Sequence, residues 1–421
     1  MKKHLGTIFR LAIAAAGITF LIMNLNWSDQ VHLPAGYVAG PGMTGGEAGA
    51  SYSVLEETDS AYRIGYRVDK PRQDVWINKS ELTTDGEGPR FKPSFATTVR
   101  QADGKLLLLG LLLLSPIYLI GAARWYLLMR VRGMDVTPVK TFRLTMVGVF
   151  FNLCMPGATG GDVMKAYYAA KGSSQRSVAV MSVIVDRACG LLGLVLLVAL
   201  VGLTMLDHPV VRRITLFMWA ALIGVVLFAW LYSHPTLRRK VGFDWLMNKL
   251  PGGGMLRNLD SAAVAYGNHK RALLGAVLMS LPVHGLVALS IATAGYALGI
   301  TQPVDYLMGT VPVAVLVGSL PISGPLGLGP MDVVTVGLLA DGVRATAHQV
   351  AMMMVIYRGY AIVLGLLGAL GLLKGGIHLH PQAEEEAGGA GGRAEVASDS
   401  PAEQGNAAEP APNERSLSRS A

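Results

Sequence analysis

Apolar residues in this chain occur in long uninterrupted runs, without the alternation of half-buried strands or the narrow stripe of surface helices. A run of roughly 18 or more residues with few charges is long enough to cross a bilayer as a helix. The pattern therefore predicts six membrane-spanning helices, at 11–28, 106–123, 177–206, 214–233, 272–300 and 345–373. The first run follows Lys2 and Lys3 and lacks an Ala-x-Ala site, so residues 1–28 are expected to be an uncleaved signal anchor with a cytoplasmic N-terminus.

Two further apolar stretches are interrupted by helix-breaking residues. Residues 144–165 contain Pro156-Gly157 and Gly160-Gly161, and residues 306–332 contain several prolines and glycines. Broken backbone is tolerated at membrane depth only where protein or a water-filled cavity satisfies it. Basic residues flank the first stretch on both sides, which favours a re-entrant helical hairpin that enters and leaves on the cytoplasmic side. A surface loop between two helices and a full crossing remain as alternatives.

Residues 29–103 are polar and form an extracytoplasmic insert between the first two predicted spans. Short β-rich runs at 52–55, 62–68 and 75–82 alternate with turn residues. The last run resembles the end of a small Src homology 3-type barrel, which could contact cell-wall material or a protein. An irregular loop with one hairpin is the alternative. At the other end, residues 375–421 are rich in Ala, Glu, Gly, Ser and Pro, so we expect a disordered cytoplasmic tail.

Composition supports an all-α polytopic membrane protein with a small β-rich insert. Of 421 residues, 52% are hydrophobic and only 15% charged, and the mean hydropathy is +0.43. The net charge of +8 could suggest nucleic acid, but the basic residues flank apolar runs, which is typical of cytoplasmic loops. We therefore expect a plasma-membrane protein that binds no nucleic acid. Two cysteines in apolar segments give no disulfide framework or zinc spacing, so no metal or cofactor is predicted.

The two broken stretches occupy equivalent places in two halves of a membrane domain that we predict at 104–374. Each half, 104–206 and 272–374, contains a span, a broken hairpin and a span with an internal arginine. Arg187 follows Asp162 by 25 residues, and Arg358 follows Asp332 by 26. The halves would run in opposite directions as inverted repeats, an arrangement typical of transporters with a site near the midplane. Coincidence is the alternative.

The ionisable residues inside these segments are the candidate site. A charge at the bilayer centre is costly and marks function by default, so Arg187 and Arg358 should face inward and be paired. The available acids are Asp162, Asp186 and Asp332, and Lys165 shares a helix face with Asp162. Guanidinium groups bind phosphate with two parallel hydrogen bonds, and backbone N–H groups of Gly160 and Gly161 could add to such an anion site. Purely structural ion pairs are the alternative.

Several separated motifs together resemble the flippase-like family that includes the transmembrane region of lysylphosphatidylglycerol synthases. They are Arg124-Trp125-Tyr126, Asn152 with Pro156-Gly157 and Gly160-Gly161-Asp162, Asp186-Arg187, Gly327-Leu328-Gly329 with Asp332, and Arg358. The resemblance covers about 104–374 and adds Arg124 and Asn152 to the substrate-binding candidates. It implies handling of anionic or polyprenyl-linked lipids. The chain departs from the family by carrying Asp186 and Asp332 where glutamate is common, and by showing no aminoacyl-transferring domain.

Three functions fit these features. The first is a flippase or transporter for a lipid with an anionic headgroup. The second is a membrane-embedded glycosyltransferase or lipid-modifying enzyme, although the sequence has no Asp-x-Asp nucleotide-sugar motif and no phosphate-binding Gly-x-x-x-x-Gly-Lys-Ser/Thr loop. The third is a scaffold that acts through the 29–103 insert. The sequence favours the transporter, without naming the lipid or the oligomeric state.

Overall fold

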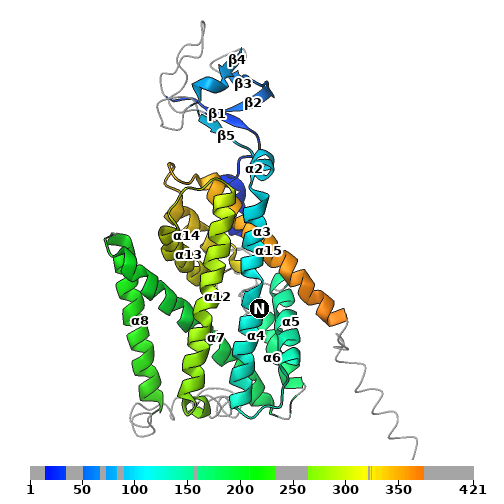
Figure 1. Cartoon of the computed structure of the whole chain (residues 1–421), viewed down its shortest axis with the longest axis vertical. Coiled ribbons are helices and arrows are strands. Elements are labelled where there is room, and N and C mark those ends of the chain that lie inside the picture. The colour runs from blue at the N-terminus through cyan, green and yellow to red at the C-terminus, as the bar shows by residue number, and fades with distance from the viewer. Residues whose placement is uncertain are drawn as a thin grey trace, which may run out of the picture. The chain divides into compact units, whose positions relative to one another are not determined.

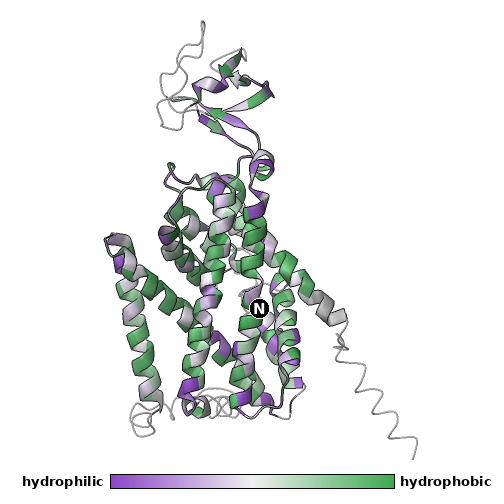
Figure 2. Ribbon diagram, viewed as in Figure 1, coloured by the Kyte–Doolittle hydropathy of each residue, from purple (hydrophilic) through white to green (hydrophobic). Residues whose placement is uncertain are grey.

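The protein is a mostly helical membrane protein whose long helices are apolar along most of their length (Figure 1, Figure 2). The computed structural model describes residues 15–34, 51–66, 73–82, 90–154, 160–171, 173, 175–207, 209–233, 264–320, 323 and 325–373. Within these residues, five helical segments are long and apolar enough to cross a membrane, at 104–131, 176–205, 211–231, 270–297 and 347–368. The fold class predicted from the hydrophobic runs is confirmed at this level.

The first predicted span is only partly within the described residues. Its described part is a helix over Ala15–Asn24, which by itself is shorter than a bilayer-spanning helix. Gly17 lies directly against the backbone of Gly329, since a Cβ atom at Gly17 would come within 2.2 Å of the Gly329 Cα. The N-terminal helix therefore packs against the start of the helix that follows the second broken stretch.

The second predicted span is two helices that join at a proline. α3 (Gly104–Leu114) is capped by the Asp103 carboxylate, which accepts hydrogen bonds from the Lys105 and Leu106 N–H groups. α4 (Pro116–Val131) begins at Pro116, because proline suits the first position of a helix and lacks the N–H group that a continuous helix would need. Both helices lie alongside α12 (Lys270–Ala297) (Figure 1).

The first broken stretch forms two helices that pack against each other, α5 (Pro138–Cys154) and α6 (Gly160–Lys171). Gly148 and Gly161 face each other so closely that a Cβ atom on Gly161 would lie 1.9 Å from the Gly148 carbonyl oxygen. The glycines thus allow backbone contact between the two helices. The predicted break at residues 156–157 falls outside the described residues.

The second broken stretch forms α13 (Val304–Gly318), a single 3₁₀ turn η3 (Pro325–Gly327) and α14 (Pro330–Leu339). α13 and α14 also pack against each other. Gly327 and Gly329 have φ values of +75° and +95°, a region that glycine adopts at little cost. These two glycines therefore allow the turn that leads into α14.

The remaining long helices are α7 (Arg176–Gly202), α8 (Pro209–Ser233) and α15 (Ala347–Leu373), with the 3₁₀ turn η2 (Leu203–Met205) between α7 and α8. Their bounds lie close to the predicted spans at 177–206, 214–233 and 345–373. α7 packs against α4, α6, α8, α12 and α13. It is therefore the central helix of the charged site described below.

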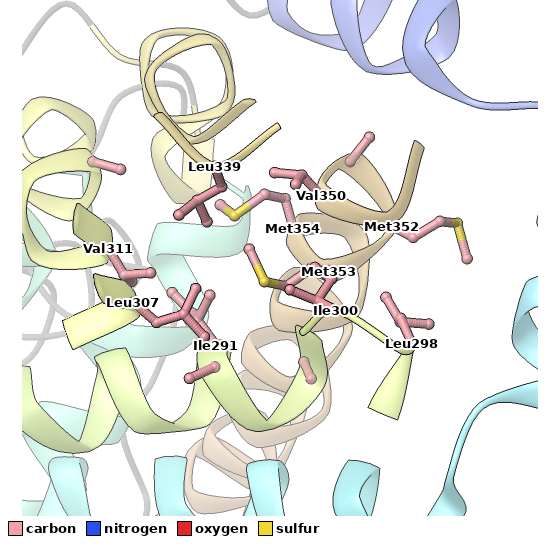
Figure 3. Packing of buried hydrophobic residues seen from close by; sticks show 14 of the residues in the cluster. Ile291, Leu298, Ile300, Leu307, Val311, Leu339, Val350, Met352, Met353 and Met354 are labelled. Atoms are coloured by element: carbon pink, nitrogen blue, oxygen red, sulfur yellow. The ribbon is translucent and has the colours of Figure 1, made fainter. Parts of the chain in front are cut away.

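The largest apolar core lies where α12, α13, α14 and α15 meet (Figure 3). Met352, Met353 and Met354 of α15 are all buried and pack with Ile291 of α12 and Leu307 of α13. The three consecutive methionines are packing residues. Within the part of the chain that the structure describes, no group of three or more His, Cys, Asp or Glu side chains could hold a metal ion.

The insert contains an antiparallel sheet of five strands in the order β4-β3-β2-β1-β5. The strands are β1 (Gln30–His32), β2 (Ser51–Glu57), β3 (Ala61–Tyr66), β4 (Gln73–Asn78) and β5 (Arg90–Lys92), with a 3₁₀ turn η1 (Lys79–Glu81) after β4. β2 pairs with both β1 and β3 and carries a register shift between Val54 and Glu56. The small core of the sheet includes Val31, Ile64 and Ile77, all fully buried. The insert is therefore β-rich, as predicted, and its likeness to a Src homology 3-type barrel stays a prediction.

A short helix, α2 (Phe95–Gln101), connects the insert to α3 and is fixed by polar contacts. His348 of α15 accepts the Asn26 N–H on its Nδ1 at 3.0 Å, and its Nε2 lies 3.0 Å from the Thr98 hydroxyl. Asp29 accepts hydrogen bonds from the Ser94 N–H and the Thr97 hydroxyl. These bonds join the end of the N-terminal helix, α2 and the start of α15.

The predicted disordered tail at 375–421 lies outside the described residues and remains a prediction.

Candidate functional site

Three ionisable side chains from three helices meet in the interior at Asp186. Arg124 of α4 donates from Nε to Asp186 Oδ1 at 2.8 Å, and Lys165 of α6 donates from Nζ to Asp186 Oδ2 at 3.2 Å. The three residues are only 9%, 5% and 5% exposed, respectively. The sequence named all three as candidates, and the structure brings them together. We call Arg124, Lys165 and Asp186 the central cluster.

The central cluster contains two cations and one anion. Among the described residues, its other contacts are with neutral groups: Arg124 donates from Nη1 to the Ser280 hydroxyl at 2.7 Å, and the Lys165 ammonium lies 4.0 Å from the centre of the Trp125 ring. The electron-rich ring face stabilises the ammonium. With both bases protonated, the cluster carries one positive charge more than its carboxylate balances. A buried charge without a partner costs several kcal/mol, so the cluster is suited to an additional anion.

Arg124 and Trp125 are both interior residues. Aromatic and basic residues together often mark the membrane surface, but Trp125 is fully buried and Arg124 nearly so. Trp125 donates from Nε1 to the Ser182 hydroxyl at 2.9 Å, which fixes the ring under Lys165. Ser280 was missed, because a lone serine in an apolar helix gives no sequence signal by itself.

Gly190 of α7 provides space for the Arg124 guanidinium. A Cβ atom at this position would lie 3.1 Å from Arg124 Nη1. Nearby, His284 of α12 hydrogen-bonds to the Gly190 carbonyl oxygen through Nε2 at 3.0 Å. His284 is thus a helix–helix contact. Its Nδ1 is buried and has no hydrogen-bond partner among the described residues.

Asp162 and Arg187 form an ion pair next to the central cluster, between α6 and α7. Asp162 and Lys165 share one face of α6 but bind neighbouring residues of α7, Arg187 and Asp186. The Arg187 side chain is 46% exposed and the Asp162 side chain 20%. The prediction that Arg187 faces inward is therefore wrong. Adjacent residues on a helix point about 100° apart, so Asp186 takes the interior position and Arg187 the outer one.

Asp332 and Arg358 form a second buried ion pair, between α14 and α15. Arg358 Nη2 lies 2.7 Å from Asp332 Oδ1 and 2.8 Å from Oδ2, and Asp332 is fully buried. Asp332 also accepts the Gly329 N–H on Oδ2 at 3.0 Å, so the carboxylate caps α14. Arg358 donates from Nη1 to the Met354 carbonyl oxygen. This pair is balanced in charge.

The two acid–arginine pairs occupy equivalent positions in the order of helices along the chain. Each acid lies in the first turn of the second hairpin helix, α6 or α14, and each arginine lies in the long helix that follows, α7 or α15. The spacings of 25 and 26 residues read from the sequence thus correspond to actual ion pairs.

The backbone of Gly160 and Gly161 has a structural role. The Gly161 N–H donates to Asn152 Oδ1 at 2.8 Å, so Asn152 closes the α5–α6 pair. Gly160 and Gly161 are buried against α5. The Gly161 N–H is therefore not available to an anion, contrary to the expectation from the sequence.

The central cluster and the Asp332–Arg358 pair are separate. Two residues of α12 mark the levels of the two sites. Ser280 binds Arg124 of the central cluster, and Thr293 lies with Tyr360 of α15 against Gly110. Ser280 and Thr293 are about 20 Å apart along α12, at about 1.5 Å per residue. Among the described residues, no ion pair or hydrogen bond links Arg124, Lys165 or Asp186 to Asp332 or Arg358. The candidate residues thus form two sites, whereas the sequence suggested one.

Comparison with known proteins supports the family suggested by the motifs. The family model for the lysylphosphatidylglycerol synthase TM region matches residues 93–369. A 131-residue segment is 31% identical to the UPF0104 membrane protein PH1989 of Pyrococcus horikoshii, covering 30% of this chain and 39% of that protein. The match thus spans about two fifths of the relative's length. All of α3 to α14 and most of α15, including every residue of both ion-pair sites, lie inside the matched region, and the chain belongs to the lysylphosphatidylglycerol synthase TM region family.

Proposed function

We propose that this protein transports a membrane lipid with an anionic headgroup, and that the central cluster binds the lipid phosphate during translocation. The observation that carries the proposal is the buried excess of positive charge at Arg124 and Lys165 over Asp186. A phosphate diester carries one negative charge, which would balance the cluster. Arginine provides paired donors to phosphate oxygens, and lysine adds a mobile point charge.

The helix arrangement supports this role. We infer that α5–α6 and α13–α14 are re-entrant hairpins of two inverted repeats, because each pair follows a span, contains a Gly/Pro-rich break and joins the next span through an acid–arginine pair. The central cluster would then lie within the membrane, at the contact between the first hairpin and α7. The basic loops at 130–143 and 171–176 would be cytoplasmic, with both termini on that side of the plasma membrane.

The charge balance of the central cluster suggests a variant that should weaken anion binding without affecting folding. Lys165→Gln leaves the Arg124–Asp186 pair intact and neutral, so the protein should fold normally. Lys171 lies on the same helix but is exposed, and Lys171→Gln is therefore the matched control.

The test is lipid translocation in reconstituted vesicles. Wild-type protein is placed in phosphatidylcholine vesicles containing a trace of phosphatidylglycerol with a fluorescent headgroup, and the fraction of probe that a membrane-impermeant reductant bleaches is measured over time. We expect wild type and Lys171→Gln to translocate the probe, and Lys165→Gln to be at least tenfold slower. Equal rates for the two variants, or no translocation by wild type, would overturn the proposal.

A further inference from the structure

An amphipathic cavity lies away from the central cluster, at the end of the bundle where the α7–α8, α12–α13 and α14–α15 connections meet. Its apolar part has a volume of about 250 Å³ and lies between α7, α8, α13 and α14. Its polar part, about 270 Å³, is lined by Gln302, Asp305, Asp341 and Arg344 among others. Tyr306 lines both parts, so the two adjoin at one side chain.

The apolar part presents almost no free polar groups, although three hydroxyl residues line it. Thr215 donates to the Val211 carbonyl, Thr310 to the Tyr306 carbonyl, and Tyr306 to the Leu338 carbonyl. Each hydroxyl proton is thus already used by the protein. The remaining surface comes from small and aliphatic residues, which suits a hydrocarbon chain. α8 packs against α7 on one side of this space, and its outer face exposes many large apolar residues, as expected beside lipid.

The polar part has one cation, Arg344, whose side chain has no partner in the part of the chain that the structure describes. The Arg344 side chain makes no hydrogen bond or ion pair within the described residues, and it is exposed. Asp341 does not neutralise it, because the carboxylate accepts the N–H groups of Val343, Arg344 and Ala345 on Oδ1 and the Gln302 amide on Oδ2. Burial raises the pKa of the Asp341 carboxyl, but these bonds outweigh burial and hold its pKa below the usual value. Asp341 is therefore a satisfied structural anion.

Asp305 supplies an acceptor in the same part of the cavity. One of its oxygens accepts the Tyr306 N–H at 2.9 Å, and its side chain is exposed. The available groups are thus one guanidinium and one carboxylate at the polar end of an apolar cavity. This pattern complements a phosphate that is followed by an amine.

We propose that this cavity binds a phospholipid of the phosphatidylethanolamine type, with one acyl chain between α8 and α13, its phosphate on Arg344 and its amine toward Asp305. This site is distinct from the central cluster, so it does not rest on transport there. The occupant is a resident or regulatory lipid of the leaflet at this end of the bundle.

The test uses phosphatidylethanolamine with a photoreactive diazirine near the end of one acyl chain, added to full-length protein in phosphatidylcholine nanodiscs. Peptide mass spectrometry locates the crosslinks. We expect them in 198–215 and 306–338. Gly337 lines the cavity, and a Cβ atom there would meet nothing within 4 Å. A larger side chain at this position should take up space in the cavity, so we expect Gly337→Leu to reduce this labelling at least fivefold. Gly224 of α8 is equally open but does not line the cavity, so Gly224→Leu is the matched control and should label as wild type.

The headgroup is tested with diacylglycerol carrying the same photoreactive chain. Wild type should label several-fold more with phosphatidylethanolamine than with diacylglycerol, and Arg344→Gln should remove the difference. Equal labelling of Gly337→Leu and wild type, labelling spread over the outer face of α8, or equal labelling by both lipids in wild type would overturn the proposal. Lys165→Gln should label as wild type, so failure of transport at the central cluster and failure of this site give different results.

Discussion

At the scale of single residues, the charged groups divide into balanced and unbalanced sets. Asp332 and Arg358 balance each other in a fully buried site, whereas Asp186 faces two cations. A balanced buried pair need not stabilise the fold, but breaking one is costly because an uncompensated charge remains. The two sets therefore predict different effects of charge removal on stability.

Asp332→Asn should be strongly destabilising, since it leaves Arg358 buried without a counter-ion. A loss of about 3–5 kcal/mol is typical for such a change. The double variant Asp332→Asn/Arg358→Gln removes both charges and should recover much of the loss. Thermal unfolding in detergent, followed as a double-mutant cycle, measures the coupling. If the double variant is less stable than Asp332→Asn, the pair is not a charge-balanced unit.

Asp186→Asn should also destabilise the protein, because it leaves Arg124 and Lys165 buried and repelling each other. Lys165→Gln should instead leave stability nearly unchanged or raise it. Both variants are compared by unfolding temperature in the same detergent. A larger loss in Lys165→Gln than in Asp186→Asn would contradict the view that the cluster carries excess positive charge.

At the scale of elements, glycine contacts fix how the first hairpin packs. Gly161→Ala should push α5 away from α6, because the added Cβ would collide with the Gly148 carbonyl oxygen, which cannot move independently of its helix. We expect a clear decrease in unfolding temperature. Gly121→Ala on α4, where a Cβ meets nothing within 4 Å, should be neutral or slightly stabilising because alanine favours helix. Equal effects of the two substitutions would show that the α5–α6 contact is looser than described.

The sequence predicted most helices but only part of the site, for physical reasons. Long apolar runs report membrane spans directly, so α7, α8, α12 and α15 lie close to their predicted ranges. The equal acid-to-arginine spacing also corresponded to real pairs. Sequence spacing did not reveal which of Asp186 and Arg187 points inward, since that depends on the rotation of α7 against its neighbours. It also could not show that Trp125 is buried under Lys165, because buried and interfacial aromatics look alike in an apolar run.

At the scale of the whole molecule, three sites with different proposed roles lie at different places in one helical bundle. The Asp332–Arg358 pair joins α14 to α15, the proposed anion site lies between α4, α6 and α7, and the proposed lipid site at Tyr306 lies between α7, α8, α13 and α14. Contacts of His348 with Asn26 and Thr98 join the insert's connecting segments to the start of α15. The insert is thus attached to the same helix that carries Arg358.

The proposed function depends on Lys165 binding a lipid phosphate, whose negative charge would balance the excess positive charge of the central cluster. The most direct measurement is solid-state NMR of full-length protein with ¹⁵N-labelled lysine side chains in phosphatidylglycerol bilayers, which detects short distances between lysine nitrogen and lipid phosphorus. We predict a nitrogen–phosphorus dipolar coupling that is present in wild type and Lys171→Gln and missing in Lys165→Gln. Identical couplings in wild type and Lys165→Gln would contradict the account.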